Sequence, residues 1–244
     1  GRWRAMKLAL FGRGAMGRLV EARASEAGHE IGNVFTSDDA ARAADELARD
    51  LSGHDAAIDF SVASAVTRNA EACALAGVPL VEGTTGWADR LEDVRRVVAS
   101  RDGALVFGAN FSVGVQIFYR VVARAAELFA AVDGYEPFVE EAHHSRKRDA
   151  PSGTALVLRD LLAARLGDKT ISVASTRAGH IPGTHRVGFD SAADQITLTH
   201  AARTREGFAA GALLAARWVQ GRRGVYDFTE VFDEILQGSP GSGV

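Results

Sequence analysis

Short apolar runs alternate with longer segments of helical spacing through the first half of the chain. The apolar runs predict buried strands at residues 7–11, 30–35, 56–60, 78–81 and 104–107. Helical spacing over residues 15–27 ends at Gly28, a residue type that often closes helices, and an acidic, Ala-rich segment covers residues 38–50. This alternation predicts parallel strands joined by right-handed crossovers, and hence a doubly wound α/β sheet.

The rhythm changes after residue 111. A long helical pattern over residues 113–132 is followed by strand-like runs at residues 137–142, 172–175, 186–189 and 195–199. Strands clustered in this way predict a second α+β domain with a mixed sheet of its own. A helical pattern at residues 206–219 and the segment 225–236 follow, and the Gly/Ser-rich residues 237–244 are expected to be disordered.

Composition narrows the class of protein. The chain has 28 Lys and Arg against 31 Asp and Glu, a net charge of −3 that argues against nucleic-acid binding. The longest uncharged stretch, residues 103–119, is slightly too short to span a bilayer, and no secretory signal precedes Met6. Residues 1–5 are interpreted as a short added leader. We therefore expect a cytoplasmic protein without nucleic-acid or membrane partners.

Cysteine usage removes two further possibilities. Cys73 is the only cysteine, so the chain cannot form an internal disulfide or a cysteine-based metal site. Its place in an Ala-rich helical segment predicts a small buried apolar residue.

A glycine-rich loop follows the first predicted strand. Gly12, Gly14 and Gly17 match G-x-G-x-x-G between a strand and a helix. In that setting the three glycines allow a tight turn, close approach of the backbone to a pyrophosphate, and close packing of helix on strand. The loop therefore predicts dinucleotide binding on a Rossmann-like sheet, against the alternative of an ordinary turn between a strand and a helix.

The end of the second predicted strand bears on the choice of nucleotide. Asp38 lies about 20 residues after Gly17, where an acid would hold the adenosine ribose of NADH. The alternative for Asp38 is an N-cap of the next helix. Thr36 and Ser37 could contact either nucleotide, and no Arg is adjacent. The choice between NADH and NADPH stays open, with a slight preference for NADH.

Five cationic or titratable residues lie within six positions of the second predicted domain. They are His143, His144, Arg146, Lys147 and Arg148. A solvated basic loop is the ordinary interpretation of such a run. Adjacent residues on a strand point to opposite faces, so the paired histidines do not predict a metal site, and none is expected.

A helix begins directly after this basic run. Pro151 and Ser152 are typical helix-start residues, which places Gly153 and Thr154 in a first turn with unpaired N–H groups. A helix N-terminus beside His, Lys and Arg is suited to an anion such as a carboxylate. With the glycine loop, this indicates hydride transfer to an acidic small molecule, with a proton from His or Lys.

Residues 141–155 resemble the substrate motif E-x-H-H-x-x-K-x-D-A-P-S-G-T-A of the 4-hydroxy-tetrahydrodipicolinate reductase family. Further stretches agree in chain order, at residues 83–86, 110–115, 177–185, 199–200, 208–212 and 224–227. The resemblance covers residues 6–236. It implies NADH- or NADPH-dependent reduction of 4-hydroxy-tetrahydrodipicolinate to tetrahydrodipicolinate, with loss of water, on the diaminopimelate and lysine route.

The same resemblance implies residue roles. His143 would be a proton donor and acceptor, and Lys147 the proton donor that completes the reduction. His144, Gly153 and Thr154 would hold the dicarboxylate substrate. Combined with the strand-end residues above, the expected cofactor contacts are Gly12, Arg13, Gly14, Ala15, Met16, Gly17, Thr36, Asp38, Gly83, Thr84, Thr85, Gly108, Ala109, Asn110 and Phe111.

The resemblance also implies domain roles and assembly. The last helix of family members returns to the first domain, which gives residues 6–111 and 222–238 to a dinucleotide-binding domain. Residues 112–221 would form a substrate-binding and oligomerisation domain, through which family members assemble as homotetramers. Two other functions stay open: a related dehydrogenase acting on an amino acid or its imine, and a cofactor-sensing protein without activity.

Several positions depart from the family pattern or carry alternatives. Thr36 stands where several members have the ribose-binding acid, and Glu82 replaces a usually apolar residue without an evident reason. His185 and His200 are interpreted as core or interface histidines rather than catalytic ones. Phe60 is placed either against the adenine or in the core.

Overall fold

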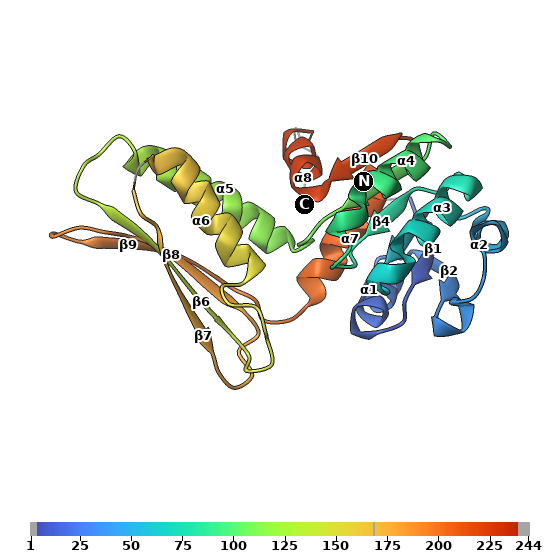
Figure 1. The fold of residues 1–244 in the computed structure, drawn as a ribbon, viewed down its shortest axis with the longest axis horizontal. Coiled ribbons are helices and arrows are strands. Elements are labelled where there is room, and N and C mark those ends of the chain that lie inside the picture. The colour runs from blue at the N-terminus through green and yellow to red at the C-terminus, as the bar shows by residue number, and fades with distance from the viewer. Residues whose placement is uncertain (1–3, 168, 239–244) are drawn as a thin grey trace. The chain divides into compact units, whose positions relative to one another are not determined.

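The computed structural model describes residues 4–167 and 169–238 (Figure 1). Residues 1–3 of the predicted leader and residues 239–244 of the Gly/Ser-rich end lie outside the described residues. The chain forms two compact units, one of residues 1–112 and 206–244 and the other of residues 113–205. Within the described ranges, no helix combines the length and the apolar character needed to cross a membrane.

The first unit contains a six-stranded, fully parallel sheet. Its strands run in the order β10-β5-β4-β3-β1-β2. They are β1 (Lys7–Phe11), β2 (Glu30–Phe35), β3 (Ala56–Asp59), β4 (Leu80–Glu82), β5 (Ala104–Phe107) and β10 (Gly224–Asp227). Every residue of β3 is buried, as expected for a central parallel strand covered on both faces. The predicted Rossmann-like doubly wound sheet is confirmed.

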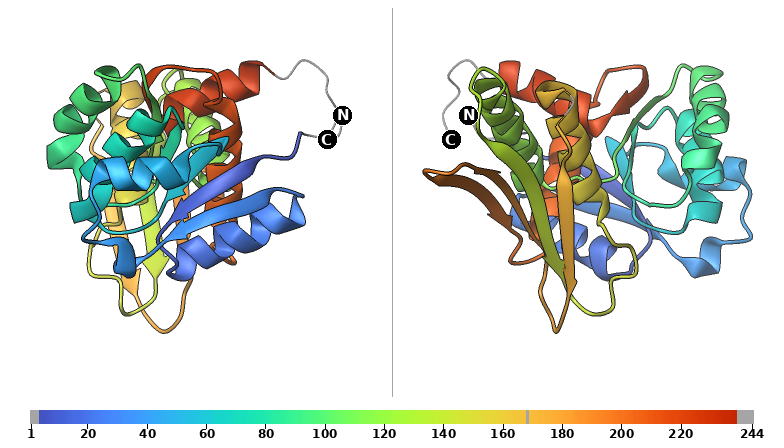
Figure 2. Two further views of the ribbon diagram at one scale, coloured as in Figure 1. Left: turned by 90° about the vertical axis from the view of Figure 1, so that its right-hand side faces the viewer. Right: turned by 60° about the vertical axis from the view of Figure 1, so that its left-hand side comes forward.

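Helices cover both faces of this sheet (Figures 1 and 2). They are α1 (Ala15–Glu26), α2 (Ala44–Leu51), α3 (Val66–Ala76), α4 (Leu91–Ala99), α7 (Glu206–Trp218) and α8 (Phe228–Gln237). Helix α3 packs between α2 and α4, while α7 packs against α1 and α8. Val94 and Val98, one turn apart on α4, are fully or almost fully buried, which shows how the amphipathic spacing drives the packing.

The second unit is an α+β layer pair. Its elements are α5 (Val113–Phe129), β6 (Glu136–His143), α6 (Gly153–Leu166), β7 (Ser172–Arg177), β8 (Thr184–Asp190) and β9 (Gln195–Ala201). The strand order is β7-β6-β8-β9, with β6 parallel to β7 and antiparallel to β8. Helices α5 and α6 pack together on one face of this sheet (Figure 2). The predicted mixed sheet is confirmed.

The boundary between the units differs from the predicted domain boundary at α7. Residues 206–221 were expected in the second domain, but α7 packs against α1, β3 and β4 in the first unit. Its Gly211 lies so close to the preceding loop that an added Cβ would stand 1.7 Å from the Phe111 carbonyl oxygen. The helical pattern of α7 does not reveal which sheet it covers, because any apolar stripe fits either core. The predicted segment 225–236 also divides, its first residues forming strand β10 before α8.

Candidate active site

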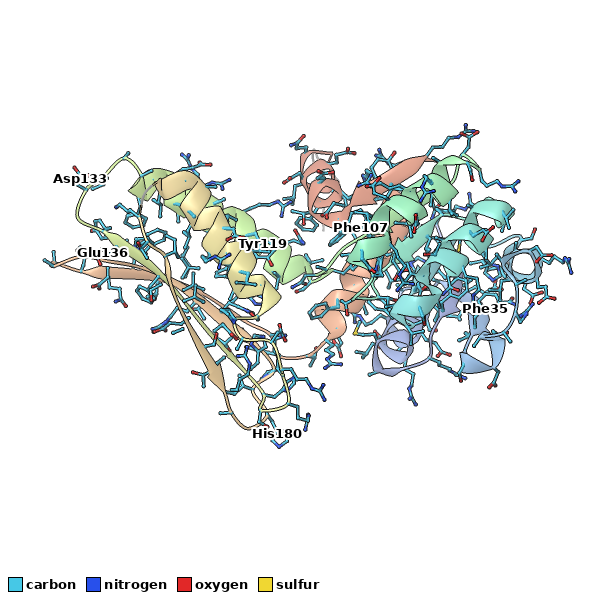
Figure 3. All side chains as sticks on the ribbon, in the orientation of Figure 1. Phe35, Phe107, Tyr119, Asp133, Glu136 and His180 are labelled. Atoms are coloured by element: carbon cyan, nitrogen blue, oxygen red, sulfur yellow. The ribbon has the colours of Figure 1, made fainter. Side chains whose placement is uncertain are left out.

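Loops that carry the predicted cofactor residues gather at one edge of the parallel sheet. They follow β1, β2, β4 and β5, and the carboxyl ends of parallel strands all point to the same edge. Phe35 and Phe107, labelled in Figure 3, are the last residues of β2 and β5. In open α/β sheets this edge is where ligands bind, at the point where the strand order reverses. Here that point lies beside β1.

The three glycines of the loop after β1 are required for three different reasons. Gly12 has φ +87°, and an added Cβ would stand 2.6 Å from the Phe60 carbonyl oxygen. A Cβ on Gly17 would stand 2.1 Å from the Gly12 carbonyl oxygen, so helix and strand could not pack this closely. Gly14 has open space, with no described atom within 4 Å of its Cβ position. The fold requires glycine at Gly12 and Gly17. Close packing does not require it at Gly14, where the open space suits the approach of a ligand.

Helix α1 begins without a neutralising side chain. Its N-cap is Gly14, no described side chain caps the helix, and its first turn has no acidic residue. Arg13 forms an ion pair with Glu21 of α1, with 3.2 Å between Nη2 and Oε1. The positive end of the helix dipole and its first N–H groups therefore suit a phosphate group.

The loop after β2 is organised by Thr36 rather than by Asp38. The Thr36 hydroxyl accepts the Asp38 N–H at 3.3 Å, and the Asp39 carboxylate accepts the Thr36 N–H at 2.9 Å. The alternative of Asp38 as an N-cap is therefore wrong: Thr36 caps the 3-10 turn of residues 37–39, and Ala43 is the N-cap of α2. The Asp38 side chain is exposed.

Hydrogen bonds and packed aromatic rings support the loops after β4 and β5. The Thr84 N–H donates to the Glu82 carboxyl at 2.8 Å, and the Trp87 indole N–H donates to the Thr84 carbonyl at 2.8 Å. The Phe60 ring covers Gly83, where an added Cβ would stand 2.2 Å from the ring. Phe111 is 2% exposed, so its ring supports the loop from the core instead of lining it.

In the second unit, Arg177, Ser152 and His143 donate hydrogen bonds to Glu141. Arg177 donates two hydrogen bonds to the two oxygens of this buried carboxylate, at 2.7 and 2.8 Å. The Ser152 N–H donates to it at 3.2 Å, and His143 Nδ1 donates to it through a short hydrogen bond. Strand register explains the meeting, since Glu141 faces His185 across β8 and His143 faces Arg177 across β7.

Electrostatics fixes the protonation of this cluster. Burial alone would raise the pKa of Glu141, but hydrogen bonds from Arg177, Ser175 and His143 outweigh it and lower the pKa to about 2. The carboxylate is therefore ionised at neutral pH and accepts from Nδ1–H of His143. That leaves Nε2 as the His143 atom that can exchange a proton. A Cβ on Gly183, which has φ +142°, would stand 3.2 Å from this Nε2.

His185 belongs to the same cluster, although sequence analysis assigned it to the core or an interface. It is 5% exposed, and its Nε2 lies 3.0 Å from the Ser152 hydroxyl. Burial, with the nearby charge of His143, lowers its pKa to about 4, so the ring is neutral at pH 7. Both His185 and Arg177 lie in the 177–185 stretch, but the sequence did not show that strand pairing brings them to His143.

Glu141, His143 and His185 also form a potential metal-ligand group, with ligand atoms within 4.8 Å of one another. The sequence predicted no metal site at the paired histidines and did not reveal this group, because His185 comes from another strand. The donor set is nevertheless already used: both Glu141 oxygens accept from Arg177, whose positive charge opposes a cation. This chemistry suits a carboxylate that orients a histidine better than a metal centre.

Lys147 and His144 lie beside this cluster. The Lys147 Nζ pairs with Asp149 at 2.8 Å, and its side chain is 25% exposed. Burial lowers the pKa of His144, and the charges of Arg146 and Arg205 lower it further. The basic run is therefore partly enclosed, unlike a fully solvated loop.

Helix α6 begins at this place as predicted. Ser152 is the N-cap, and its hydroxyl accepts the Ala155 N–H at 3.2 Å. Gly153 and Thr154 are the first two helical residues, and the first turn has no acid. The Thr154 side chain hydrogen-bonds to Tyr119 of α5, labelled in Figure 3. No described atom lies within 4 Å of the Gly153 Cβ position, so a small anion could approach the backbone there.

Known proteins resemble this chain along most of its length. It matches family models described as dihydrodipicolinate reductase, N-terminus, over residues 6–111, and dihydrodipicolinate reductase, C-terminus, over residues 114–232. The 4-hydroxy-tetrahydrodipicolinate reductase of Christiangramia forsetii is 32% identical, covering 95% of this chain and 100% of the relative. The protein of the same name from Thiobacillus denitrificans is 37% identical, covering 84% of this chain and 83% of the relative.

Solved structures support the fold. Dipicolinate-bound dihydrodipicolinate reductase from Paenisporosarcina sp. TG-14 superposes with a TM-score of 0.72 at 19% identity, covering 93% of this chain and 100% of that one. Apo scyllo-inositol dehydrogenase from Lactobacillus casei superposes with a TM-score of 0.52 at 11% identity, covering 99% and 91%. Given the two family models and these relatives, the chain belongs to the dihydrodipicolinate reductase family.

Proposed function

We propose that this protein reduces 4-hydroxy-tetrahydrodipicolinate to tetrahydrodipicolinate, with NADH or NADPH as hydride donor, in diaminopimelate and lysine biosynthesis. The observation that carries the proposal is the start of α6: Gly153 and Thr154 stand there beside His143, whose Nδ1 is held by an ionised carboxylate. An anion site next to an oriented proton-transfer group fits a carboxylate substrate that must gain a proton. The family membership supports this substrate.

The proposed residue roles are those that the family resemblance implies, and charge and geometry support them. The N–H groups of Gly153 and Thr154, with His144, hold a substrate carboxylate. Loss of water leaves an unsaturated ring, and a hydride added to one carbon of the double bond requires a proton at its partner atom. Lys147 donates that proton, and His143 donates and accepts protons through Nε2. Glu141 keeps His143 in the tautomer that makes this possible.

The proposed cofactor is a reduced nicotinamide dinucleotide, which supplies the hydride when bound. The uncapped start of α1 would hold its pyrophosphate, with Gly14 as the point of closest approach. Thr36 and Asp38 would face the adenosine ribose. The exposed Asp38 carboxylate favours NADH, but Thr36 does not repel a 2′-phosphate, so we propose that both nucleotides serve, with NADH preferred.

The remaining proposals concern the setting of the enzyme. The only partner needed is a small dicarboxylate, and the net charge of −3 favours neither nucleic acid nor an anionic membrane surface. We propose a cytoplasmic homotetramer assembled through the second domain, without a metal cofactor. Stripping the protein with a chelator should leave its rate unchanged.

The decisive assay follows the loss of absorbance of the reduced nicotinamide. Substrate is generated in place from pyruvate and aspartate semialdehyde by a synthase, and NADH and NADPH are run side by side. We expect turnover only when the synthase is present. Lys147→Ala should abolish most of it, while Arg148→Ala, a neighbouring cation without an assigned role, should not.

Two results would overturn the proposal. No turnover by folded protein with either nucleotide would favour a protein that has lost activity. Turnover of an amino acid or its imine in place of the ring substrate would favour the related dehydrogenase. Full activity of Lys147→Ala would leave the enzyme but remove the assigned proton donor.

A further inference from the structure

Two carboxyl groups are buried side by side beneath the loop at residues 83–85. Asp59 is the last residue of β3 and Glu82 the last of β4, and the two are direct partners in the parallel register. Both are 0% exposed. Glu82 stands where the family pattern usually has an apolar residue. Two negative charges on paired residues of adjacent strands would be costly in a dry interior, so the pair must share at least one proton.

Hydrogen bonding indicates which of the two carries that proton. Asp59 accepts three donors: the Ser61 N–H at 2.7 Å, the Asn69 side-chain amide at 2.7 Å and the Thr84 hydroxyl at 3.3 Å. Among the described residues, Thr84 is the one that donates to Glu82, with its N–H 2.8 Å from Oε1. Its Oε2 receives no hydrogen bond from the described residues. A carboxylate with three donors stays ionised, whereas an oxygen without a donor is the natural place for a proton.

The charges around the pair agree with this assignment. Burial raises the pKa of Glu82 well above its usual range, and the neighbouring charge of Asp59 raises it further. The pKa of Asp59 is also raised by burial, but its donors and Glu82 itself act to lower it. From α3, the Cys73 thiol has a pKa raised by burial and is neutral, and Arg68 donates to the side-chain amide oxygen of Asn69 rather than to either acid.

The pair also controls the loop above it. Thr84 is tied to both acids, through its N–H to Glu82 and through its hydroxyl to Asp59. The Gly83 N–H donates to the Asp59 carbonyl at 2.9 Å, and the Ser61 N–H donates to the Thr84 hydroxyl at 3.1 Å. The loops after β3 and β4 are therefore joined through one shared network.

We propose that Glu82 is a positioning residue of the cofactor site: as a neutral acid it donates to Asp59 and accepts from Thr84, and so holds residues 83–85 in the form that binds the dinucleotide. The identity of the ligand in this inference rests on the proposed function. The ordering of the loop by Glu82 does not depend on that function. In the ionised form Glu82 would lose its donor and repel Asp59. The loop is therefore ordered only while Glu82 keeps its proton.

Three variants separate this role from simple core filling. Glu82→Gln keeps both a donor and an acceptor without titrating, and Glu82→Leu keeps the volume but removes both. Glu71→Gln, at an exposed position of α3, controls for the same chemical change elsewhere in the unit. The measurements are hydrogen exchange of the peptide containing Thr84, and the Kd, KM and kcat for the reduced nucleotide.

We expect the Gln variant to keep slow Thr84 exchange and a Kd within about twofold of the parent. The Leu variant should exchange faster and bind the nucleotide about tenfold more weakly, with a smaller change in kcat, because one buried hydrogen-bonded anchor is lost. Equal exchange and equal Kd in the parent and the Leu variant would overturn the inference. A Gln variant as impaired as the Leu variant would do so too.

The proton itself is tested without any ligand, by unfolding at a series of pH values. Glu82 ionises near pH 4.5 in the unfolded chain but only at higher pH in the folded one. The folded state thus holds the extra proton, and stability falls as pH rises above about 4.5. Relative to Glu82→Gln, the folding equilibrium constant of the parent should drop by up to about tenfold per pH unit in this range.

A flat difference between the parent and the Gln variant would mean that Glu82 is ionised in the fold, and the inference would fail. The unfolding and hydrogen-exchange experiments also distinguish a failure of this inference from a failure of the proposed function. If the parent bound no nicotinamide nucleotide, the proposed function would fall, while the exchange and unfolding results would still decide whether Glu82 orders the loop.

Discussion

His143, the proposed proton-transfer residue, is oriented by Glu141, which has no proposed part in the chemistry itself. Both carboxylate oxygens of the buried Glu141 accept hydrogen bonds, and its pKa is about 2. An ionised carboxylate at Nδ1 fixes both the tautomer and the orientation of the imidazole. The Arg177 fork prevents the carboxylate from turning away, so the two residues act together on one ring.

Replacing Glu141 by Gln should separate orientation from binding. The amide cannot stabilise a charged imidazolium, so we expect kcat to fall by about 100-fold, with a smaller change in the substrate KM. Steady-state kinetics measures both. Glu140→Gln is the matched control, since Glu140 is the adjacent residue of β6 and pairs with Arg186 instead. Equal loss in both variants would indicate damage to the sheet rather than to His143.

His185 predicts how stability depends on pH. Its folded pKa of about 4 is below the ordinary value of 6.5, so the folded protein favours the neutral ring. The stabilisation is complete above pH 6.5 and is lost as pH falls towards 4, on the order of 3 kcal/mol in total. His185→Gln, which keeps an acceptor for Ser152, should have a shallower loss of unfolding free energy over that range. Parallel curves for parent and variant would contradict the assignment.

At the scale of elements, two helix N-termini are the proposed anion sites, one in each unit. Helix α1 starts at Gly14 without a side-chain cap, and α6 starts at Gly153 after the Ser152 cap. At both glycines the Cβ position is open and the backbone is one that other residues adopt. Neither glycine is needed by the fold, which leaves ligand approach as the reason for each.

Alanine at these two positions therefore gives a reciprocal test. Gly14→Ala should raise the KM for the nucleotide about tenfold or more and leave the substrate KM unchanged, because the methyl group occupies the space of the pyrophosphate. Gly153→Ala should raise the substrate KM and leave the KM for the nucleotide unchanged. Both proteins should unfold at or slightly above the parent temperature, since alanine restricts the unfolded chain. A matched rise of both KM values in either variant would show a general disturbance instead.

At the scale of the whole molecule, the chain contains two units with different kinds of sheet. The first has a parallel sheet, whose strand ends necessarily meet at one edge, and the second has a mixed sheet, which places residues by register. The proposed tetramer should give a mass near four times 25.8 kDa by light scattering. A mass of one or two chains under assay conditions, with full activity, would remove assembly from the requirements of the reaction.

Local patterns were enough to predict much of this protein. The parallel and mixed sheets, the glycine loop after β1 and the helix starting after Ser152 depend on spacing and on residue types with strong backbone preferences. Such preferences act within a few residues, so they can be read along the chain. The family resemblance added the expected substrate and the roles of His143 and Lys147, which remain proposals.

Contacts between distant residues were decided only by the tertiary structure. Arg177 and His185 join Glu141 through strand register, which apolar alternation constrains to a face but not to a partner. Helix α7 covers the first sheet although its stripe fits either core. Glu82 has no evident reason along the sequence, and only the strand register places it beside Asp59, because a buried acid can be understood only with the groups that share its proton.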